Sequence, residues 1–289
     1  MAEPLKIRVA KDAGFCFGVR DAIEKARKTA SKYGKVYMLG DIVHNERVVK
    51  QLAQENIEVV DSLDEIQDAP VLFRAHGTIP ALWEQAAQKD IKIVDATCPL
   101  VHEIHDEIRK LHAEDRKLFI IGDHGHDEVI AIQAQVPSAT VISNIAEAQQ
   151  VPRLKKAGIV SQSTQMIENV QSIISILSMK IFDLRFVNTV CFPTRRNQEQ
   201  IKFIAPDSDV MIIVGSNTSA NTRRLLEVSL SLNPRSYMVE KAEDIDQSWF
   251  SDAESVGVSA GASSPDDLIA EVVEQLRNLH VEASAQNEE

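Results

Sequence analysis

The three cysteines of this chain recur at one place in a repeated sequence pattern. Cys16, Cys98 and Cys191 are its whole cysteine content, and each lies 24 residues before a glycine that closes an apolar run. These glycines are Gly40, Gly122 and Gly215. An isolated cysteine is often a small buried apolar residue, but that role does not account for equal offsets. We therefore expect one shared site where three similar modules meet, and a thiolate-bound metal centre would explain the pattern.

Composition limits the class of protein. The 289 residues are 44% hydrophobic and carry a formal net charge of −12. This charge argues against binding of nucleic acids or anionic membranes, since such surfaces cluster lysine and arginine. The few cysteines, the lack of a secretory signal and the lack of a ~20-residue apolar run predict a cytoplasmic protein with no membrane partner.

Short apolar runs alternate with longer segments of helical periodicity. Strands are expected at 7–10, 36–39, 71–74, 91–95, 118–121, 158–160, 210–214 and 256–259. The clearest helical segments are 19–31, 102–113 and 268–279. This alternation predicts βαβ units around parallel sheets, and continuous apolar strands are typical of such sheets because both faces are buried. The expected fold class is α/β, with three similar α/β modules.

The predicted module limits follow from the repeat. The modules span 16–98, 99–191 and 192–281, the N-terminal strand at 5–14 joins the third module, and 282–289 form a disordered acidic tail. Polar or glycine-containing clusters follow the strands of every module, at 40–41, 75–78, 122–123, 161–164, 215–216 and 260–264. Open α/β sheets bind ligands at the carboxyl ends of their strands. Glycine-rich turns also occur there without a ligand, but the cysteine offsets favour a functional edge.

Each cysteine follows a short strand and precedes a helical segment. Pro99 and Pro193 suit the first turn of a helix. A thiolate at a helix N-terminus is stabilised by the helix dipole and its amides, which favours metal ligation. The chain has no Cys-x-x-Cys pair, so a zinc ribbon or ferredoxin loop is excluded. Three thiolates leave one iron of a cubane cluster without a protein ligand, and substrate chemistry requires such an open position.

Other polar residues occupy strand-end loops. His44, His76 and His126 are donors that suit a phosphate or diphosphate, although histidines also cap loops. Glu128 could relay protons beside a metal, or it could be an exposed glutamate at a helix start. The third module instead offers neutral donors at 216–222 and 263, which serve either as N-caps or as phosphate ligands.

Three further histidines lie in one helical segment. We interpret His102, His105 and His112 as surface residues of a charged helix face.

At these residues the chain resembles the 4-hydroxy-3-methylbut-2-enyl diphosphate reductase family, which acts last in the non-mevalonate isoprenoid route. The resemblance runs roughly from residue 7 to residue 275. The motifs that carry it are Gly14-Phe15-Cys16, Ile42-Val43-His44-Asn45, Ala75-His76-Gly77, Asp95-Ala96-Thr97-Cys98-Pro99-Leu100-Val101, Gly125-His126-Asp127-Glu128, Ser161-Gln162-Ser163-Thr164, Val214-Gly215-Ser216 and Ala260-Gly261-Ala262-Ser263. So many motifs in one order make the match specific.

The resemblance implies a fold, a cofactor and a set of ligands. The three lobes would surround one 4Fe-4S cluster with pseudo-threefold symmetry, ligated by Cys16, Cys98 and Cys191 with its apical iron open to substrate. The implied diphosphate ligands are His44, His76 and His126 on one side and Ser219, Asn221 and Ser263 on the other.

The resemblance also implies a reaction. Glu128 would deliver protons, and the hydroxyl of Ser163 or Thr164 would orient the substrate alcohol. The reaction is reductive dehydroxylation of 4-hydroxy-3-methylbut-2-enyl diphosphate to isopentenyl and dimethylallyl diphosphate by two one-electron transfers. A donor such as ferredoxin or flavodoxin would supply the electrons.

Some positions depart from the family pattern. The run Pro193-Thr194-Arg195-Arg196-Asn197-Gln198 differs from the usual one, Ala220 stands where serine is common, and Ser163 replaces a usual threonine but keeps the hydroxyl. Two other functions remain open at this point. One is a non-redox iron–sulfur hydratase, and the other is an iron–sulfur sensor or binding protein.

Overall fold

Three parallel four-stranded sheets with one common strand order form the protein. The computed structural model describes residues 5–286. The first sheet has the order β3 (Ile57–Val60), β2 (Val36–Leu39), β4 (Val71–Phe73) and β5 (Ile93–Asp95). The second has β7 (Thr140–Ile142), β6 (Lys117–Ile121), β8 (Leu154–Ser161) and β9 (Ile181–Phe186). The third has β11 (Ser236–Val239), β10 (Val210–Val214), β12 (Ser255–Ala260) and β1 (Lys6–Val9). The predicted α/β class with parallel sheets is therefore confirmed.

The third sheet takes its last strand from the start of the chain. In the first two sheets the fourth strand follows the third along the chain, whereas β1 pairs with β12 in parallel, Lys6 beside Ser255 and Val9 beside Val258. The N-terminal strand was expected in this sheet. Its place means that all three sheets have the same order even though the chain has no strand after β12 among the described residues.

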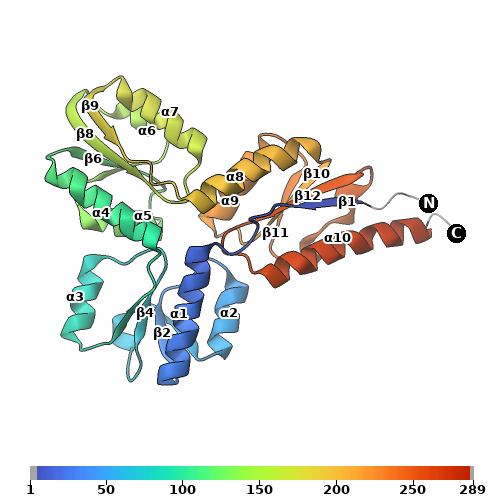
Figure 1. The fold of residues 1–289 in the computed structure, drawn as a ribbon, viewed down its shortest axis with the longest axis horizontal. Coiled ribbons are helices and arrows are strands. Elements are labelled where there is room, and N and C mark those ends of the chain that lie inside the picture. The colour runs from blue at the N-terminus through green and yellow to red at the C-terminus, as the bar shows by residue number, and fades with distance from the viewer. Residues whose placement is uncertain (1–4, 287–289) are drawn as a thin grey trace. The chain divides into compact units, whose positions relative to one another are not determined.

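Helices connect the strands, as parallel pairing requires (Figure 1). They are α1 (Phe17–Tyr33), α2 (Glu46–Gln54), α3 (Pro80–Gln88), α4 (Pro99–Ala113), α5 (Asp127–Gln135), α6 (Ile145–Gln150), α7 (Ile167–Ser178), α8 (Phe192–Ile204), α9 (Ala220–Leu230) and α10 (Asp266–Gln286). Short 3₁₀ turns lie at η1 (Leu63–Glu65), η2 (Ala205–Asp207), η3 (Ala242–Asp244) and η4 (Gln247–Phe250). The three helical segments expected from periodicity lie inside α1, α4 and α10.

The chain divides into two compact units. Unit one comprises the described parts of Met1–Cys16, His44–Glu46 and Phe192–Glu289, and it contains the third sheet. Unit two comprises Phe17–Val43 and Arg47–Cys191, and it contains the first and second sheets. The module limits at 16–98, 99–191 and 192–281 stay a prediction about the repeat.

The second sheet shows why its strands are continuously apolar. Leu118 and Ile120 of β6 pack with α4 and α5 on one face, whereas Phe119 and Ile121 pack with α6 and α7 on the other. Successive side chains of a strand point to opposite faces. Since helices cover both faces, residues 118–121 of β6 are all buried and apolar, and only Lys117 at the start of the strand is exposed.

Part of the predicted C-terminal tail lies within the described residues. Residues 282–286 were expected to be disordered, but α10 continues to Gln286. This stretch contains glutamate, alanine, serine and glutamine and neither glycine nor proline, so nothing in it interrupts a helix. The rest of the predicted tail, 287–289, lies outside the described residues.

Helix α4 buries one histidine that was interpreted as a surface residue. His102 and His112 are exposed, but His105 is only 5% exposed and packs against Gly77. A Cβ on Gly77 would lie 2.9 Å from His105 Cε1, and Gly77 has a φ of +86°. Both the close contact and the backbone conformation therefore require glycine. Burial, with help from the charges of His102 and Arg109, lowers the pKa of His105 to about 4.

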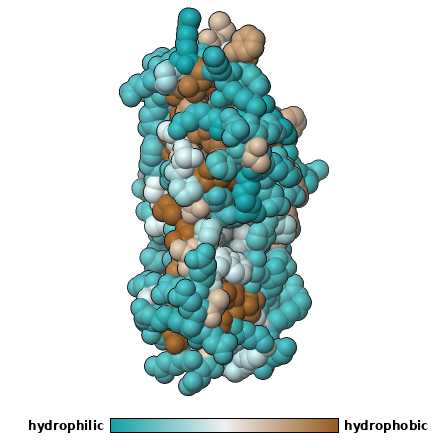
Figure 2. Space-filling view, turned by 90° about the vertical axis from the view of Figure 1, so that its left-hand side faces the viewer, coloured by the Kyte–Doolittle hydropathy of each residue, from teal (hydrophilic) through white to brown (hydrophobic). Residues whose placement is uncertain are grey.

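The surface seen in Figure 2 is mainly hydrophilic, and its apolar residues appear in separate areas. Among residues 5–286, no helix combines the length and the apolar character that spanning a bilayer requires.

The buried imidazole predicts how stability depends on pH. Because the folded pKa of His105 lies below the value of about 6.5 in an unfolded chain, the unfolded state binds more protons between these values. Stability should be fully present above pH 6.5 and should fall as the pH drops towards 4, by on the order of 2 kcal/mol at pH 5. Urea unfolding at pH 7.5 and pH 5 measures this, and His105→Gln should reduce the difference. The exposed His112→Gln is the control; an equal loss in all three proteins would contradict the prediction.

Candidate active site

The three cysteines occupy equivalent backbone positions in the three sheets. In each sheet the cysteine amide donates a hydrogen bond to the carbonyl that lies two residues after the third strand. The pairs are Cys16–Ala262 at 3.3 Å, Cys98–Ala75 at 3.0 Å and Cys191–Ser163 at 2.9 Å. A helix begins at the residue after each cysteine, α1, α4 and α8 respectively. Each thiol is therefore held at a helix N-terminus, where the dipole favours a thiolate.

The donor set suits an iron–sulfur cluster, although its ligands come from both units. All three thiols are half-buried and none forms a disulfide. Cys16 belongs to unit one, and Cys98 and Cys191 belong to unit two. Within either unit, the described residues contain no group of three His, Cys, Asp or Glu side chains arranged for a metal ion. The three-cysteine site would draw ligands from both units and stays a prediction.

Unit two brings two of the predicted imidazoles together. The rings of His76 and His126 lie 5.8 Å apart between centroids, at an interplanar angle of 79°. His76 follows β4, whereas His126 caps α5, because its Nδ1 accepts the amide N–H of Glu128 at 3.1 Å. An accepting Nδ1 carries no proton. In the neutral ring, that tautomer puts the ring donor of His126 at Nε2.

Glu128 is a buried carboxyl held by one serine. It lies in the first turn of α5 and is 1% exposed, so the interpretation as an exposed glutamate is wrong. Its Oε1 accepts the Ser163 amide at 2.5 Å, and its Oε2 accepts the Ser163 hydroxyl at 2.7 Å. Two hydrogen bonds from one residue fix both the position and the rotation of the carboxyl group.

Ser163 also connects this carboxyl to a cysteine. Its amide and hydroxyl hold Glu128, and its carbonyl accepts the amide of Cys191. The predicted acid and a predicted cluster ligand are thus joined through a single residue at the end of β8. The neighbouring Thr164 accepts a hydrogen bond from Gln162 Nε2 at 3.1 Å, and Gln162 Oε1 accepts the amide of Asp123 at 3.0 Å. This ties the β8 loop to the β6 loop.

Unit one contributes neutral donors, two of which are buried without a partner. Ser219 caps α9 by accepting the amide of Thr222 at 3.3 Å. Asn221 is 6% exposed and Ser263 is 8% exposed; neither Asn221 Nδ2 nor Ser263 Oγ has a hydrogen-bond partner among the described residues. An unsatisfied buried polar group costs about 1–3 kcal/mol. Two such donors beside a helix N-terminus suit a ligand with anionic oxygens.

One turn of the backbone presents a site residue in every sheet. The residue directly after the carbonyl that accepts the cysteine amide is His76 in the first sheet, Thr164 in the second and Ser263 in the third. The turns close with equivalent hydrogen bonds, Gly77 to Arg74, Gln165 to Gln162 and Ser264 to Gly261, at 3.0–3.1 Å. The sequence pattern predicts these three clusters, at 75–78, 161–164 and 260–264, but not which residue of each takes the equivalent position, because the distance along the chain from turn to cysteine differs between modules.

The predicted ligands fall in both units. His44, Ser219, Asn221 and Ser263 belong to unit one, and the residues His76, His126, Glu128, Ser163 and Thr164 belong to unit two. The complete set of three imidazoles therefore stays a prediction, while the pairing of His76 with His126 is observed.

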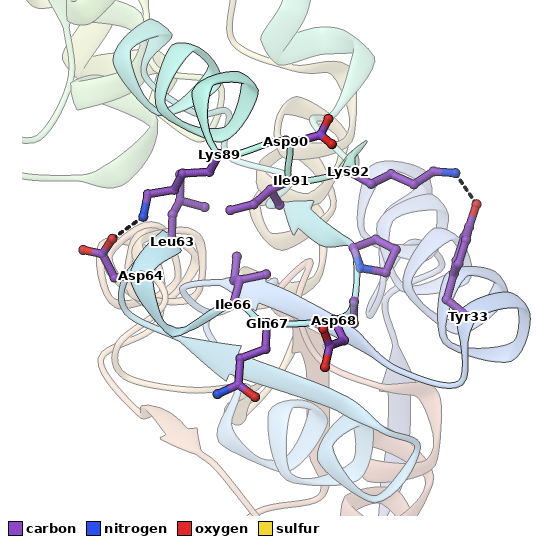
Figure 3. Close-up of a pocket in the computed structure, with 12 residues that line it drawn as sticks. Tyr33, Leu63, Asp64, Ile66, Gln67, Asp68, Lys89, Asp90, Ile91 and Lys92 are labelled. Carbon is purple, nitrogen blue, oxygen red and sulfur yellow. Dashed lines mark hydrogen bonds and ion pairs between the residues drawn. The ribbon is translucent and has the colours of Figure 1, made fainter.

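A pocket of about 530 Å³ lies away from these loops, at the amino ends of β4 and β5. Pro70 and Lys92 line the pocket, and each directly precedes one of the two strands. Figure 3 shows Ile66 and Ile91 between two polar pairs, Lys89 with Asp64 and Lys92 with Tyr33. Its lysines are already engaged with these partners, and it lies at the opposite ends of the strands from the predicted site, so the pocket is no part of that site.

Comparison with known proteins agrees with the resemblance. The model of the LytB protein family matches residues 7–277. The 4-hydroxy-3-methylbut-2-enyl diphosphate reductase of Geobacter metallireducens is 38% identical over 276 residues, covering 95% of this chain and 98% of its own length. That of Aquifex aeolicus is 35% identical over 280 residues, covering 94% and 96%.

Two solved structures are similar over nearly the whole chain. One, described as (E)-4-hydroxy-3-methyl-but-2-enyl diphosphate reductase, the terminal enzyme of the non-mevalonate pathway, is 34% identical with a TM-score of 0.69 and covers 95% of this chain and 99% of that one. The other, E-1-hydroxy-2-methyl-but-2-enyl-4-diphosphate reductase from Plasmodium falciparum, is 26% identical with a TM-score of 0.90 and covers 94% and 88%. From its sequence match, its relatives and its fold, the chain belongs to the LytB protein family.

Proposed function

We propose that this protein reduces 4-hydroxy-3-methylbut-2-enyl diphosphate to isopentenyl and dimethylallyl diphosphate. The observation that carries the proposal is the link from Glu128 through Ser163 to Cys191, because it joins a buried carboxyl to a predicted cluster ligand through one residue. Relatives that carry this enzyme name match over almost their full length. The net reaction consumes two electrons and two protons, breaks the C–O bond of the alcohol, forms one C–H bond and releases water.

Cys16, Cys98 and Cys191 would hold one 4Fe-4S cluster in this proposal. When bound, the cluster supplies electrons one at a time and an iron position open to the substrate hydroxyl. The three equivalent amide hydrogen bonds support this assignment, since they hold the backbone of each cysteine at the equivalent position before a helix N-terminus. A small reduced donor of the ferredoxin or flavodoxin class would supply the two electrons.

Histidines and neutral donors would bind the diphosphate. His76 and His126 offer ring N–H groups from unit two, and His44 belongs to the same proposed set. Ser219, Asn221 and Ser263 offer hydroxyl and amide donors, two of them buried without a partner. Hydrogen bonds to anionic oxygens are among the stronger ones in proteins. Their role is to hold the diphosphate so that the alcohol end of the substrate reaches the cluster site.

Glu128 would move the protons. As a carboxylic acid it can protonate the departing hydroxyl so that it leaves as water. Once water has protonated the carboxylate again, it can deliver the second proton to the allylic carbon. Ser163 holds the carboxyl with two hydrogen bonds and so limits the directions in which the proton can be given. The hydroxyl of Ser163 or Thr164 would orient the substrate alcohol.

The role of Glu128 is tested by Glu128→Gln, which keeps the shape and removes the proton. The turnover number should fall about 10²- to 10⁴-fold while KM changes little, because general acid catalysis contributes that much to rate. Steady-state kinetics with dithionite-reduced viologen measure both.

Glu147→Gln is the matched control, because Glu147 also accepts the amide and the hydroxyl of one serine, Ser143. It should keep full turnover. An unchanged rate in Glu128→Gln would overturn the proposed acid role.

The cluster assignment is tested by Cys98→Ser and Cys191→Ser. After anaerobic reconstitution both should lose most of the visible thiolate-to-iron absorption and more than about 10²-fold of activity, since the thiolate is the metal ligand. The exposed His112→Gln should reconstitute normally. A full cluster spectrum in both variants would contradict the assignment, and product formation without any reductant would favour a hydratase.

The diphosphate assignment predicts a different kinetic pattern. Asn221→Ala and Ser263→Ala remove buried donors that lack a protein partner, so KM should rise about 10-fold while the turnover number changes little. Ser248→Ala, in η4, is the control and should change neither value. Unchanged KM values in the first two variants would show that these donors do not contact the substrate.

A further inference from the structure

An ion pair joins the two loops that carry the paired histidines of unit two. Arg74 Nη1 lies 2.7 Å from Asp127 Oδ2, and the two side chains are only 25% and 28% exposed. Arg74 stands directly after β4, two residues before His76. Asp127 is the first residue of α5, between His126 and Glu128. The pair thus connects the first sheet to the second beside the proposed site.

The arginine is confined on its other side by the end of β2. Gly40 has a φ of +71°, and a Cβ on it would lie 2.8 Å from Arg74 Nη1. The guanidinium therefore lies against the backbone of Gly40 and is held between this turn and the carboxylate of Asp127. A side chain packed in this way loses less freedom on pairing than an exposed one. Isolated surface ion pairs contribute little, but this pair is largely buried and bridges three strand-end loops.

The negative charge of Asp127 also affects the binding of an anion by its neighbours. Its carboxylate is favoured at the N-terminus of α5 by the helix dipole. An unpaired negative charge between His126 and Glu128 would nevertheless oppose an anionic ligand. The guanidinium of Arg74 neutralises that charge at 2.7 Å. The pair can thus act by position, by charge or by both, and the two effects predict opposite results when Asp127 is removed.

We propose that the Arg74–Asp127 ion pair is a positioning element that sets the distance between His76 and His126 for diphosphate binding. That the two histidines bind a diphosphate rests on the proposed function. Neither residue needs to touch the substrate. The pair fixes the β4 loop to the start of α5, and these two segments carry the rings that lie 5.8 Å apart.

A double-mutant cycle with Arg74→Ala, Asp127→Ala and the double variant tests the proposal. Each single variant should raise KM about 5- to 10-fold, with a smaller change in turnover number, because a displaced loop weakens ground-state binding. The double variant should be no worse than the poorer single one, since both remove the same interaction. Arg74→Lys should recover part of the loss, because it keeps the charge without the forked geometry.

The matched control is the pair Arg27–Glu55, which also joins two segments of unit two at 2.7 Å. Arg27→Ala and Glu55→Ala should leave KM unchanged. Thermal unfolding of every variant shows whether a KM change merely reports loss of folded protein. Additive effects in the cycle would overturn the proposal.

Binding of inorganic diphosphate, measured by calorimetry on the anaerobic holoprotein, gives a second readout that needs no turnover. Asp127→Ala should bind diphosphate several-fold more weakly than wild type. Tighter binding would show that the pair acts only by neutralising charge, and this result would overturn the positioning role. If wild type binds diphosphate but does not reduce the proposed substrate, the proposed function fails. The double-mutant cycle of Arg74 and Asp127 can then still be measured by calorimetry.

Discussion

The hydrogen bond from each cysteine amide to the carbonyl two residues past the third strand is the constraint around which the proposed site is built. It recurs in all three sheets, at Cys16, Cys98 and Cys191, with distances of 2.9–3.3 Å. Parallel strands end at one edge, so a bond across that edge fixes the loop after the fourth strand to the loop after the third. The residue that follows the accepting carbonyl is then presented in the same way in every sheet, whatever its chemistry.

That shared frame explains how one repeat supports different chemistry. At the equivalent turn position the chain has His76 in one sheet and Ser263 in another. The second sheet adds a carboxyl, because Ser163 holds Glu128 and also accepts from Cys191. The buried imidazole of His105 packs against Gly77 in the turn of the first sheet, and the Arg74–Asp127 pair joins that turn to the start of α5. The strand order and the cysteine hydrogen bond are repeated, whereas the side chains at the turn differ between the sheets.

Sequence reasoning predicted every central strand of the described sheets but only two of their edge strands, β1 and β5. All six central strands, such as β10, were predicted, because helices on both faces leave a continuous apolar run. The four strands that were missed, β3, β7, β9 and β11, all lie at sheet edges, where exposed and buried positions mix. The burial of His105 was also not predicted. It depends on the space left by Gly77, and the local sequence around His105 does not indicate this contact.

By itself the sequence determined the α/β class, the threefold recurrence of the cysteines and the family, because these depend on local periodicity and on motifs read in order. Only the tertiary structure decided which residues share a turn, that β1 completes the third sheet, and that Ser163 joins Glu128 to Cys191. The hydrogen bonds and strand pairs behind these relations link residues from 23 to more than 200 positions apart. They follow from which strand ends meet at a sheet edge, and pairing order is a property of the folded chain rather than of any segment.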